Sequence, residues 1–177
     1  MVQPGDDLAV LILDALTEMG EALTDDDVIV LAQKIVSKAE NRYLDLRTVT
    51  PSEEACRLAK EVDKDPRKVQ AILDESNEVV RKREGVLIVE HRLGFVQANA
   101  GIDQSNISHE EDDEDNLCLL LPVDSDKSAR VLREEIKKRT GLRVGVVIND
   151  SLGRAWRNGT LGLAIGCLLY TSPSPRD

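Results

Sequence analysis

The segment that most constrains the fold is residues 144–159, which read V-G-V-V-I-N-D-S-L-G-R-A-W-R-N-G. Its first five residues are glycine or mostly β-branched apolar residues, a composition that predicts a strand buried on both faces. Asn149, Asp150 and Ser151 follow at the point where this strand should leave the core. A rigid strand that ends in polar side chains is a common way to present ligand-binding groups. A purely structural interpretation is equally open, in which Asp150 or Ser151 only caps the start of a helix.

Two arginines follow this strand. Gly153 permits a turn, and Arg154 and Arg157 are spaced so that one side of a short turn can carry both. A guanidinium group matches the oxygens of a phosphate or a carboxylate. Arg154 and Arg157 are therefore candidate anion-binding residues.

A second polar segment is expected after a β-hairpin. Residues 86–89 and 95–98 flank the turn at 91–94 and predict two antiparallel strands, with His91 exposed in the turn. The second strand continues into N-A-G-I-D-Q-S-N at residues 99–106, which contains Asp103. Carboxylates from two loops, together with phosphate oxygens and water, would suit Mg²⁺ or Mn²⁺. The sequence does not show that Asp103 and Asp150 meet.

Helices are predicted from apolar periodicity and from their caps. Residues 8–19 show one apolar helical face, with Asp6 as the expected cap and Gly20 at the end. Thr50-Pro51-Ser52-Glu53 and Asp65-Pro66 are typical helix starts. Residues 125–140 predict an amphipathic helix that stops at Gly141. Glu75 and Glu78 are expected on exposed helix surface.

The strand predicted at residues 28–32 precedes Gln33, Lys34 and Lys38. The spacing of the two lysines favours ordinary solvated charges. The alternative is that Lys38, which follows Ser37, contacts a phosphate group.

Composition excludes several classes of protein. The net charge of −10 opposes general binding to a nucleic-acid backbone, and the few aromatic residues disfavour base stacking. Since the chain lacks a long apolar span and a typical secretion signal at its start, no membrane partner and a cytoplasmic location are expected. Its three cysteines are expected to be reduced thiols rather than disulfides or zinc ligands. The acidic run at residues 109–115 is interpreted as a solvated loop.

Several motifs resemble one known family in colinear order over about residues 4–166. They are G-D-D-L near the start, V-S-K-A-E at 36–40, D-P-R-K-V-Q-A-I-L-D-E-S at 65–76, N-A-G-I-D-Q-S-N at 99–106 and N-D-S-L-G-R-A-W-R-N-G at 149–159. The family is the coenzyme F(420)-0:gamma-glutamyl ligases. The resemblance implies an α+β fold with mixed or antiparallel sheets and short helices, in a protein that works as an intertwined homodimer.

The resemblance also implies a reaction. GTP activates the carboxylate of a phosphorylated deazaflavin precursor, and the amino group of L-glutamate then forms an amide; later glutamates are joined through the gamma-carboxylate. Mg²⁺ or Mn²⁺ is the implied cofactor, with K⁺ as a further candidate cation. Metal and lysine would offset the phosphate charge, so positioning and electrostatics would supply most of the catalysis.

Site residues are carried over by position in this resemblance. Asp103, Asp150 and Ser151 match metal ligands. Lys38 and Asn106 match nucleotide-contacting positions, and Gln33 and Lys34 align with a nucleotide-contacting pair that is Ser-Thr in some members. No residue is assigned to direct acid–base or nucleophilic catalysis.

The chain departs from the family pattern at both ends. It begins at the G-D-D-L segment, and a long C-terminal part of the family pattern, with further nucleotide contacts and a metal ligand, is absent. Residues 1–166 are therefore predicted to be a partial ligase domain, and residues 167–177 a non-native tail. Two alternatives stay open, a nucleotide- or metal-binding module without turnover and an inactive fragment.

Overall fold

The computed structural model describes residues 1–105, 115–153 and 159–169. The chain forms two compact units, and each has its own core. Unit 1 comprises Met1–Arg42, Pro122–Ser151 and Thr160–Asp177, and unit 2 comprises Tyr43–Leu121 and Leu152–Gly159. Helices combine with mixed and antiparallel sheets, which confirms the predicted α+β class. Within the described ranges, no helix is long and apolar enough to cross a membrane.

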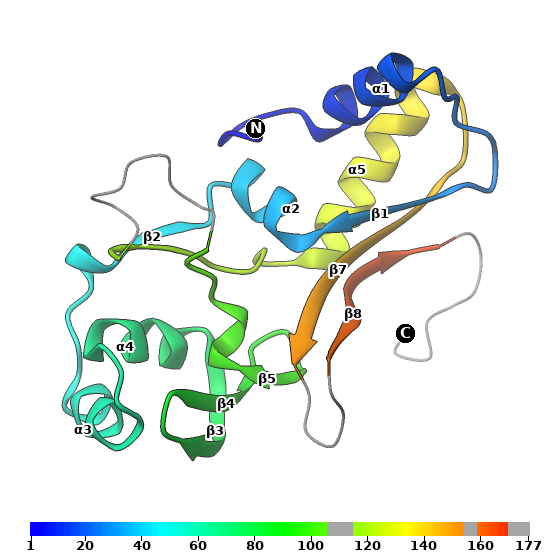
Figure 1. Ribbon diagram of the computed structural model, residues 1–177. Coiled ribbons are helices and arrows are strands. Elements are labelled where there is room, and N and C mark those ends of the chain that lie inside the picture. The colour runs from blue at the N-terminus through cyan, green and yellow to red at the C-terminus, as the bar shows by residue number, and fades with distance from the viewer. Residues whose placement is uncertain (106–114, 154–158, 170–177) are drawn as a thin grey trace. The chain divides into compact units, whose positions relative to one another are not determined.

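Unit 1 is built on a sheet with the strand order β1-β7-β8 (Figure 1). Strands β1 and β7 run parallel, with Val28 opposite Gly145 and Ala32 opposite Asn149. Helix α5 packs against β8, and α1 packs against α5. The elements of this unit are α1 (Leu8–Met19), β1 (Val28–Ala32), α2 (Gln33–Ala39), α5 (Ser125–Thr140), β7 (Gly145–Gly153, whose last two residues are assigned to unit 2) and β8 (Thr160–Leu168).

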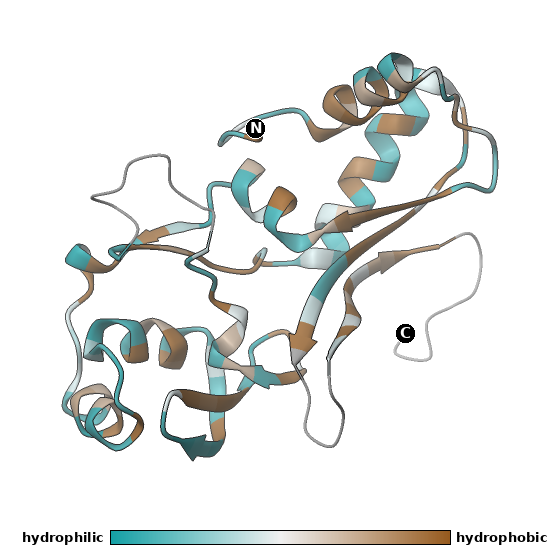
Figure 2. Ribbon diagram, in the orientation of Figure 1, coloured by the Kyte–Doolittle hydropathy of each residue, from teal (hydrophilic) through white to brown (hydrophobic). Residues whose placement is uncertain are grey.

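The core of unit 1 lies between this sheet and its helices. Leu31, Val146 and Ile148 are buried on the strands, and Leu132 and Ile136 come from α5. Each such side chain, once fully buried, contributes about 1.5–3 kcal/mol through the hydrophobic effect. Figure 2 shows β1 and the beginning of β7 as hydrophobic and a more polar segment further along β7.

Caps fix the ends of the helices in unit 1. Asp7, rather than the predicted Asp6, caps α1, because its carboxylate accepts from the backbone N–H groups of Ala9 and Val10. Asp124 caps α5, which ends at Gly141 as predicted. The positive φ of 79° at Gly141 suits glycine and stops the helix.

Unit 2 contains an antiparallel sheet in the order β3-β4-β5 and the separate pair β2-β6. The predicted hairpin is confirmed by β4 and β5, which pair from Ile88 opposite Ala98 to Glu90 opposite Val96. The elements of this unit are β2 (Tyr43–Asp45), the 3₁₀ turn η1 (Leu46–Thr48), α3 (Glu53–Val62), α4 (Pro66–Asp74), β3 (Ser76–Arg83), β4 (Val86–His91), β5 (Val96–Ala98), the 3₁₀-type turn η2 (Asn99–Gly101) and β6 (Leu117–Leu119).

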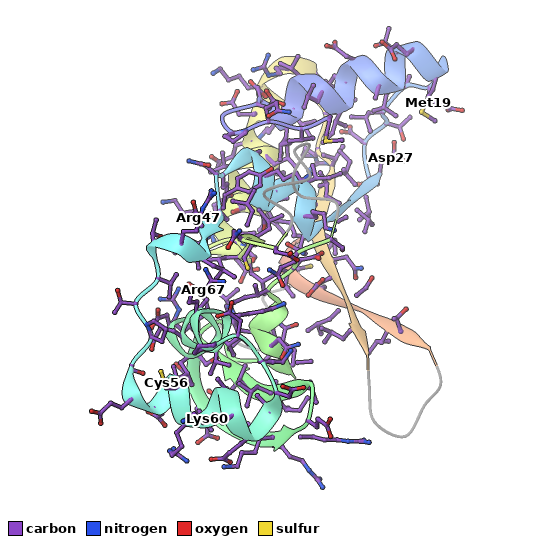
Figure 3. All side chains as sticks on the ribbon, turned by 60° about the vertical axis from the view of Figure 1, so that its left-hand side comes forward. Met19, Asp27, Arg47, Cys56, Lys60 and Arg67 are labelled. Atoms are coloured by element: carbon purple, nitrogen blue, oxygen red, sulfur yellow. The ribbon has the colours of Figure 1, made fainter. Side chains whose placement is uncertain are left out.

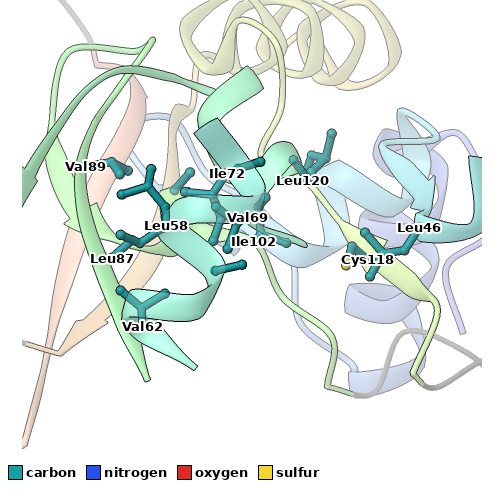
Figure 4. Close-up of a cluster of buried hydrophobic side chains, with 14 residues drawn as sticks. Leu46, Leu58, Val62, Val69, Ile72, Leu87, Val89, Ile102, Cys118 and Leu120 are labelled. Atoms are coloured by element: carbon teal, nitrogen blue, oxygen red, sulfur yellow. The ribbon is translucent and has the colours of Figure 1, made fainter. Parts of the chain in front are cut away.

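The core of unit 2 is aliphatic. Figure 4 shows α3 and α4 contributing Leu58, Val62, Val69 and Ile72 to it, together with Cys118 from β6. Cys118 is buried and has a free thiol, as predicted, whereas Cys56 and Cys167 are exposed.

The prediction for the end of α4 was wrong. The helix stops at Asp74, and Glu75 is its C-cap and is buried. Glu78 is exposed, but it lies on β3 and not on a helix.

Candidate functional site

In unit 1, strand β1 leads directly into helix α2, because Ala32 ends the strand and caps the helix. Gln33 and Lys34 are the first two residues of α2. Gln33 is buried, and its side-chain oxygen accepts a 2.9 Å hydrogen bond from the hydroxyl of Ser37. The first turn of α2 is therefore held by its own side chains.

Lys38 lies in the next turn of α2 and is only 6% exposed. The interpretation of Lys38 as a solvated surface charge is therefore wrong. Its ammonium nitrogen lies 4.0 Å from the sulfur of Met1. A lysine is rarely buried to this degree unless its charge is compensated, so the burial singles out Lys38 within unit 1.

Strand β7 carries Asp150 and Ser151. The strand continues to Gly153, so neither residue caps a helix. Because Asn149 is opposite Ala32 in the parallel pairing, Asp150 follows at the edge of the sheet where α2 begins. Asp150 is half-buried, and its carboxylate accepts a 2.8 Å hydrogen bond from the backbone N–H of Ser151. Unit 1 thus brings Asp150 and Ser151 to the sheet edge that carries Gln33 and Lys34.

In unit 2, Asp103 follows a left-handed turn formed by Asn99, Ala100 and Gly101, whose φ angles are 52°, 53° and 65°. This conformation costs a non-glycine residue about 1–2 kcal/mol. The side chain of Asn99 helps to hold it, since its oxygen accepts a 3.1 Å hydrogen bond from the backbone N–H of Leu87. The turn fixes the direction in which the chain approaches Asp103.

Asp103 itself is held by its neighbours. Its backbone N–H donates to the carbonyl of Leu119 at 3.0 Å, and the N–H of Leu119 donates back at 2.8 Å. One carboxylate oxygen of Asp103 accepts from the backbone N–H and from the hydroxyl of Ser105, at 2.7 and 2.8 Å. The carboxylate is therefore oriented by the protein before any ligand binds.

Charged residues gather around β6 near Asp103. Arg67, labelled in Figure 3, binds both carboxylate oxygens of Asp65 through its Nε atom, at 3.1 and 3.0 Å. The hydrogen bonds from the Arg67 side chain lower the pKa of Asp65 below its usual 3.8. Burial, in contrast, raises the pKa of the Cys118 thiol.

Replacing Arg67 by alanine is expected to raise the pKa of Asp65 part of the way back, because the backbone N–H of residue 67 still donates to Asp65 at 2.8 Å. A lowered folded pKa means that Asp65 stabilises unit 2 above the unfolded pKa of 3.8 and loses this contribution as pH falls through the folded value. Carbon-13 NMR titration of the Asp65 carboxyl group measures the change. Arg57→Ala on α3 is the control, and an unchanged Asp65 titration in Arg67→Ala would contradict the assignment.

The remaining predicted residues, Asn106, Arg154 and Arg157, lie outside the described residues, as do positions 109–114 of the acidic run. Within residues 1–105, 115–153 and 159–169, no group of three or more His, Cys, Asp or Glu side chains is arranged to hold a metal ion. The chemistry of Asp103, Asp150 and Ser151 nevertheless fits Mg²⁺ or Mn²⁺, since all three supply hard oxygen donors.

Unit 1 also contains a cavity of about 750 Å³ between the start of α1, the end of α2 and α5. Apolar residues such as Val36, Leu132 and Ile148 line it, and acidic residues stand beside them. None of the predicted site residues that the structure describes lines this cavity.

The sequence therefore encodes an α+β chain with polar side chains directly after β1, on β7 just beyond its pairing with β1, and at Asp103 after its turn. The family model described as F420-0:Gamma-glutamyl ligase matches residues 1–170. The chain belongs to this family.

Several curated relatives are each named coenzyme F420:L-glutamate ligase. The relative from Methanothermobacter thermautotrophicus is 45% identical over 166 residues, which cover 94% of this chain and 64% of the relative. The relative from Methanococcus maripaludis strain S2 is 47% identical and covers 88% and 61%, and that from Archaeoglobus fulgidus is 42% identical and covers 94% and 62%. The chain thus spans less than two thirds of the length of these relatives.

Proposed function

We propose that this chain acts in the ligation of L-glutamate to the deazaflavin coenzyme F(420)-0. The observation that carries the proposal is membership of the F420-0:Gamma-glutamyl ligase family, with relatives that are named for this activity. The structure of unit 1 supports it, because α2, which contains the buried Lys38, directly follows β1, and the oriented carboxylate of Asp150 comes directly after the segment of β7 that pairs in parallel with β1. The carboxyl end of parallel strands is a common position for ligand-binding groups.

The proposed reaction has two steps. A carboxylate oxygen of the phosphorylated deazaflavin attacks the γ-phosphorus of GTP, and the bond to GDP breaks to leave an acyl phosphate. The amino group of glutamate then attacks the acyl carbon, loses a proton and releases phosphate as the amide forms. Later glutamates are joined through the gamma-carboxylate. Because the phosphoryl group carries most of the charge, orientation and charge compensation supply much of the catalysis.

Residues of the chain are assigned to these tasks by the family pattern. Lys38, with Gln33, Lys34 and Asn106, contacts the nucleotide. Asp150, Ser151 and Asp103 would supply oxygen ligands for Mg²⁺ or Mn²⁺, a cation that would offset phosphate charge when bound. Arg154 and Arg157 bind an anionic group of a substrate. Assembly as a homodimer is part of the same proposal.

Replacing Asp150 by asparagine is expected to lower GTP-dependent glutamate addition by about 10²-fold or more, equivalent to about 3 kcal/mol of transition-state stabilisation. The reason is that a neutral amide is a poorer ligand for a hard divalent cation. Asp14→Asn, at an exposed position on α1, is the matched control. The assay follows glutamate addition by mass spectrometry. Equal activity of Asp150→Asn and Asp14→Asn would exclude the assigned role of Asp150.

A second candidate is a nucleotide- or metal-binding module without turnover. It is favoured by the buried Lys38 and the oriented carboxylate of Asp150, since such groups can bind a phosphate and a cation without any turnover. Calorimetry with GTP and Mn²⁺ separates the two candidates. Metal-dependent GTP binding with no release of phosphate supports the module, whereas glutamate addition supports the ligase.

A further inference from the structure

Three basic residues lie at the start of α4 in unit 2, and they are compensated to different degrees. We call Lys64, Arg67 and Lys68 the α4 basic cluster. The charge of Arg67 is balanced by Asp65, and its Nη1 atom also donates to the amide oxygen of Asn116 at 3.3 Å. The guanidinium group of Arg67 is therefore already bound to other residues of unit 2.

The two lysines of the cluster form no ion pair with the acidic residues that the structure describes. Lys64 is half-buried, and among the described residues its ammonium group forms no hydrogen bond or ion pair, although its backbone N–H donates to the carbonyl of Ala59 at 3.0 Å. Lys68 donates from Nζ to the side-chain oxygen of Gln104, which is neutral. Burial and, to a smaller extent, the charge of Lys68 lower the pKa of Lys64. Two like charges are thus held close together, and no carboxylate of the described residues binds either ammonium group.

The position of these lysines connects them with Asp103. Gln104, whose side-chain oxygen accepts from Lys68, directly follows Asp103 in the chain. Its Nε2 atom donates to the backbone carbonyl of Asp115 at 3.3 Å. The charges of Lys68 and Asp103 both act on the thiol of Cys118, so both lie near this residue of β6. Lys68 therefore lies in the same neighbourhood of unit 2 as Asp103, and it binds the side chain of the residue that follows Asp103.

The net charge of the chain bears on how this pair of lysines is interpreted. With a net charge of −10, the chain disfavours anions in general. An anionic substrate therefore needs a local group of cations. Ammonium groups suit this role, because each offers three donors and can follow the orientation of an oxyanion.

We propose that Lys64 and Lys68, together with the side chain of Gln104, form an oxyanion-binding subsite on unit 2. The ligand is a carboxylate or phosphate group, and its oxygens would accept hydrogen bonds from the two ammonium groups. That this group belongs to a ligase substrate rests on the function proposed above. The binding of the oxyanion itself does not depend on turnover.

Calorimetric titration of the 177-residue chain with inorganic phosphate and, separately, with glutarate tests the subsite. The Lys64→Gln/Lys68→Gln variant is expected to bind the preferred probe at least tenfold more weakly than the parent. Lys60→Gln/Lys137→Gln removes the same charge from exposed positions and should bind within twofold of the parent. Phosphate and glutarate distinguish the two possible ligand groups. Failure of the parent to bind either probe, or equal weakening in both variants, would overturn the proposal.

Two further measurements distinguish a loss of the binding groups from a loss of folding in the variants. Circular dichroism compares the unfolding of the variants, and Lys64→Arg/Lys68→Arg keeps both charges and should restore binding to within a few-fold. In the parent, NMR of the Lys64 side chain should show that the bound oxyanion raises the pKa of Lys64, because a nearby anion favours the ammonium form. A Lys64 pKa that does not respond to the bound probe would contradict direct contact.

Assays of glutamate addition separate this proposal from the proposed function. If the parent adds glutamate and Lys64→Gln/Lys68→Gln does so with unchanged KM for each substrate, the subsite is wrong and the ligase function stands. If the parent adds no glutamate but its oxyanion binding is lost in the same variant, the subsite stands and the ligase function is wrong.

Discussion

Replacing Gly166 by alanine is expected to destabilise unit 1 by about 3 kcal/mol, because β8 passes too close to the start of α5 to admit a side chain. A Cβ atom at this position would lie 2.3 Å from the carbonyl oxygen of Ser125 and 2.5 Å from its carbonyl carbon. Both are backbone atoms that cannot rotate away. The adjoining hydrogen bond from the N–H of Cys167 to Asp126, at 2.9 Å, would also be disturbed. Urea unfolding followed by circular dichroism measures the loss.

Gly162→Ala is the matched control on the same strand. A Cβ atom at Gly162 would approach the side-chain oxygen of Asn149 at 2.8 Å. This is the end of a flexible side chain, which can rotate away, so the expected loss is about 1 kcal/mol or less. Equal losses at Gly162 and Gly166 would show that the strand moves freely and that contact with α5 does not fix it.

The helices were the part of the fold that local sequence could predict best. The predicted helix at residues 125–140 is confirmed as α5 with the same bounds. Its capping acid, its apolar spacing and its terminal glycine all lie within one short stretch and indicate the same ends. The start of α4 was predictable for the same reason, since Asp65 caps it. For α3 the predicted start was two residues too early, because Ser52 and not Thr50 caps the helix and Pro51 lies outside it.

Strand β3 was not predictable from its own residues, which read S-N-E-V-V-R-K-R. They show no regular alternation of apolar and polar side chains. The strand forms because it pairs with the buried strand β4, where Val79 lies opposite Val89. Pairing between segments can override a weak local preference, and the extension of β7 to Gly153 beside β8 is a further case.

In the candidate site, too, some features were predictable from local sequence, whereas others depend on packing between distant segments. The order of strand and polar residues predicted that Asp150 lies where a buried strand leaves the core. Asp150 does come directly after the segment paired with β1, but β7 itself continues to Gly153. The burial of Lys38 was not predictable from its spacing, because it depends on the packing of α2 within unit 1. The neighbourhood of Lys68 and Gln104 was also not predictable, since 35 residues separate them in the chain.

His91 is the residue whose environment differs most from the sequence prediction. It was expected to be exposed in a turn, but it is only 2% exposed at the end of β4. Its ring stacks on Phe95, with 5.2 Å between ring centroids and 3° between planes. Nδ1 accepts a 3.0 Å hydrogen bond from the backbone N–H of Leu93, and Nε2 lies 3.7 Å from a carboxylate oxygen of Glu75. The hairpin therefore closes around this ring.

Replacing His91 by alanine is expected to destabilise unit 2 by about 2–4 kcal/mol. The substitution leaves a cavity beside Phe95 and removes the acceptor for the Leu93 N–H. It also removes the ring near Glu75, whose other oxygen accepts from Arg92 at 2.7 Å. Urea unfolding measures the change, with Val96→Ala at an exposed position of the same hairpin as the control, expected within about 0.5 kcal/mol.

The comparison distinguishes a structural histidine from an ordinary turn residue. A loss in His91→Ala no larger than that in Val96→Ala would mean that the hairpin closes without the ring. His91→Phe separates the two contributions further, because it retains an aromatic ring that can stack on Phe95 but offers no acceptor to the Leu93 N–H. His91→Phe is expected to lose some free energy of unfolding relative to the parent, but less than His91→Ala loses. This order follows because packing and the hydrogen bond each stabilise the turn.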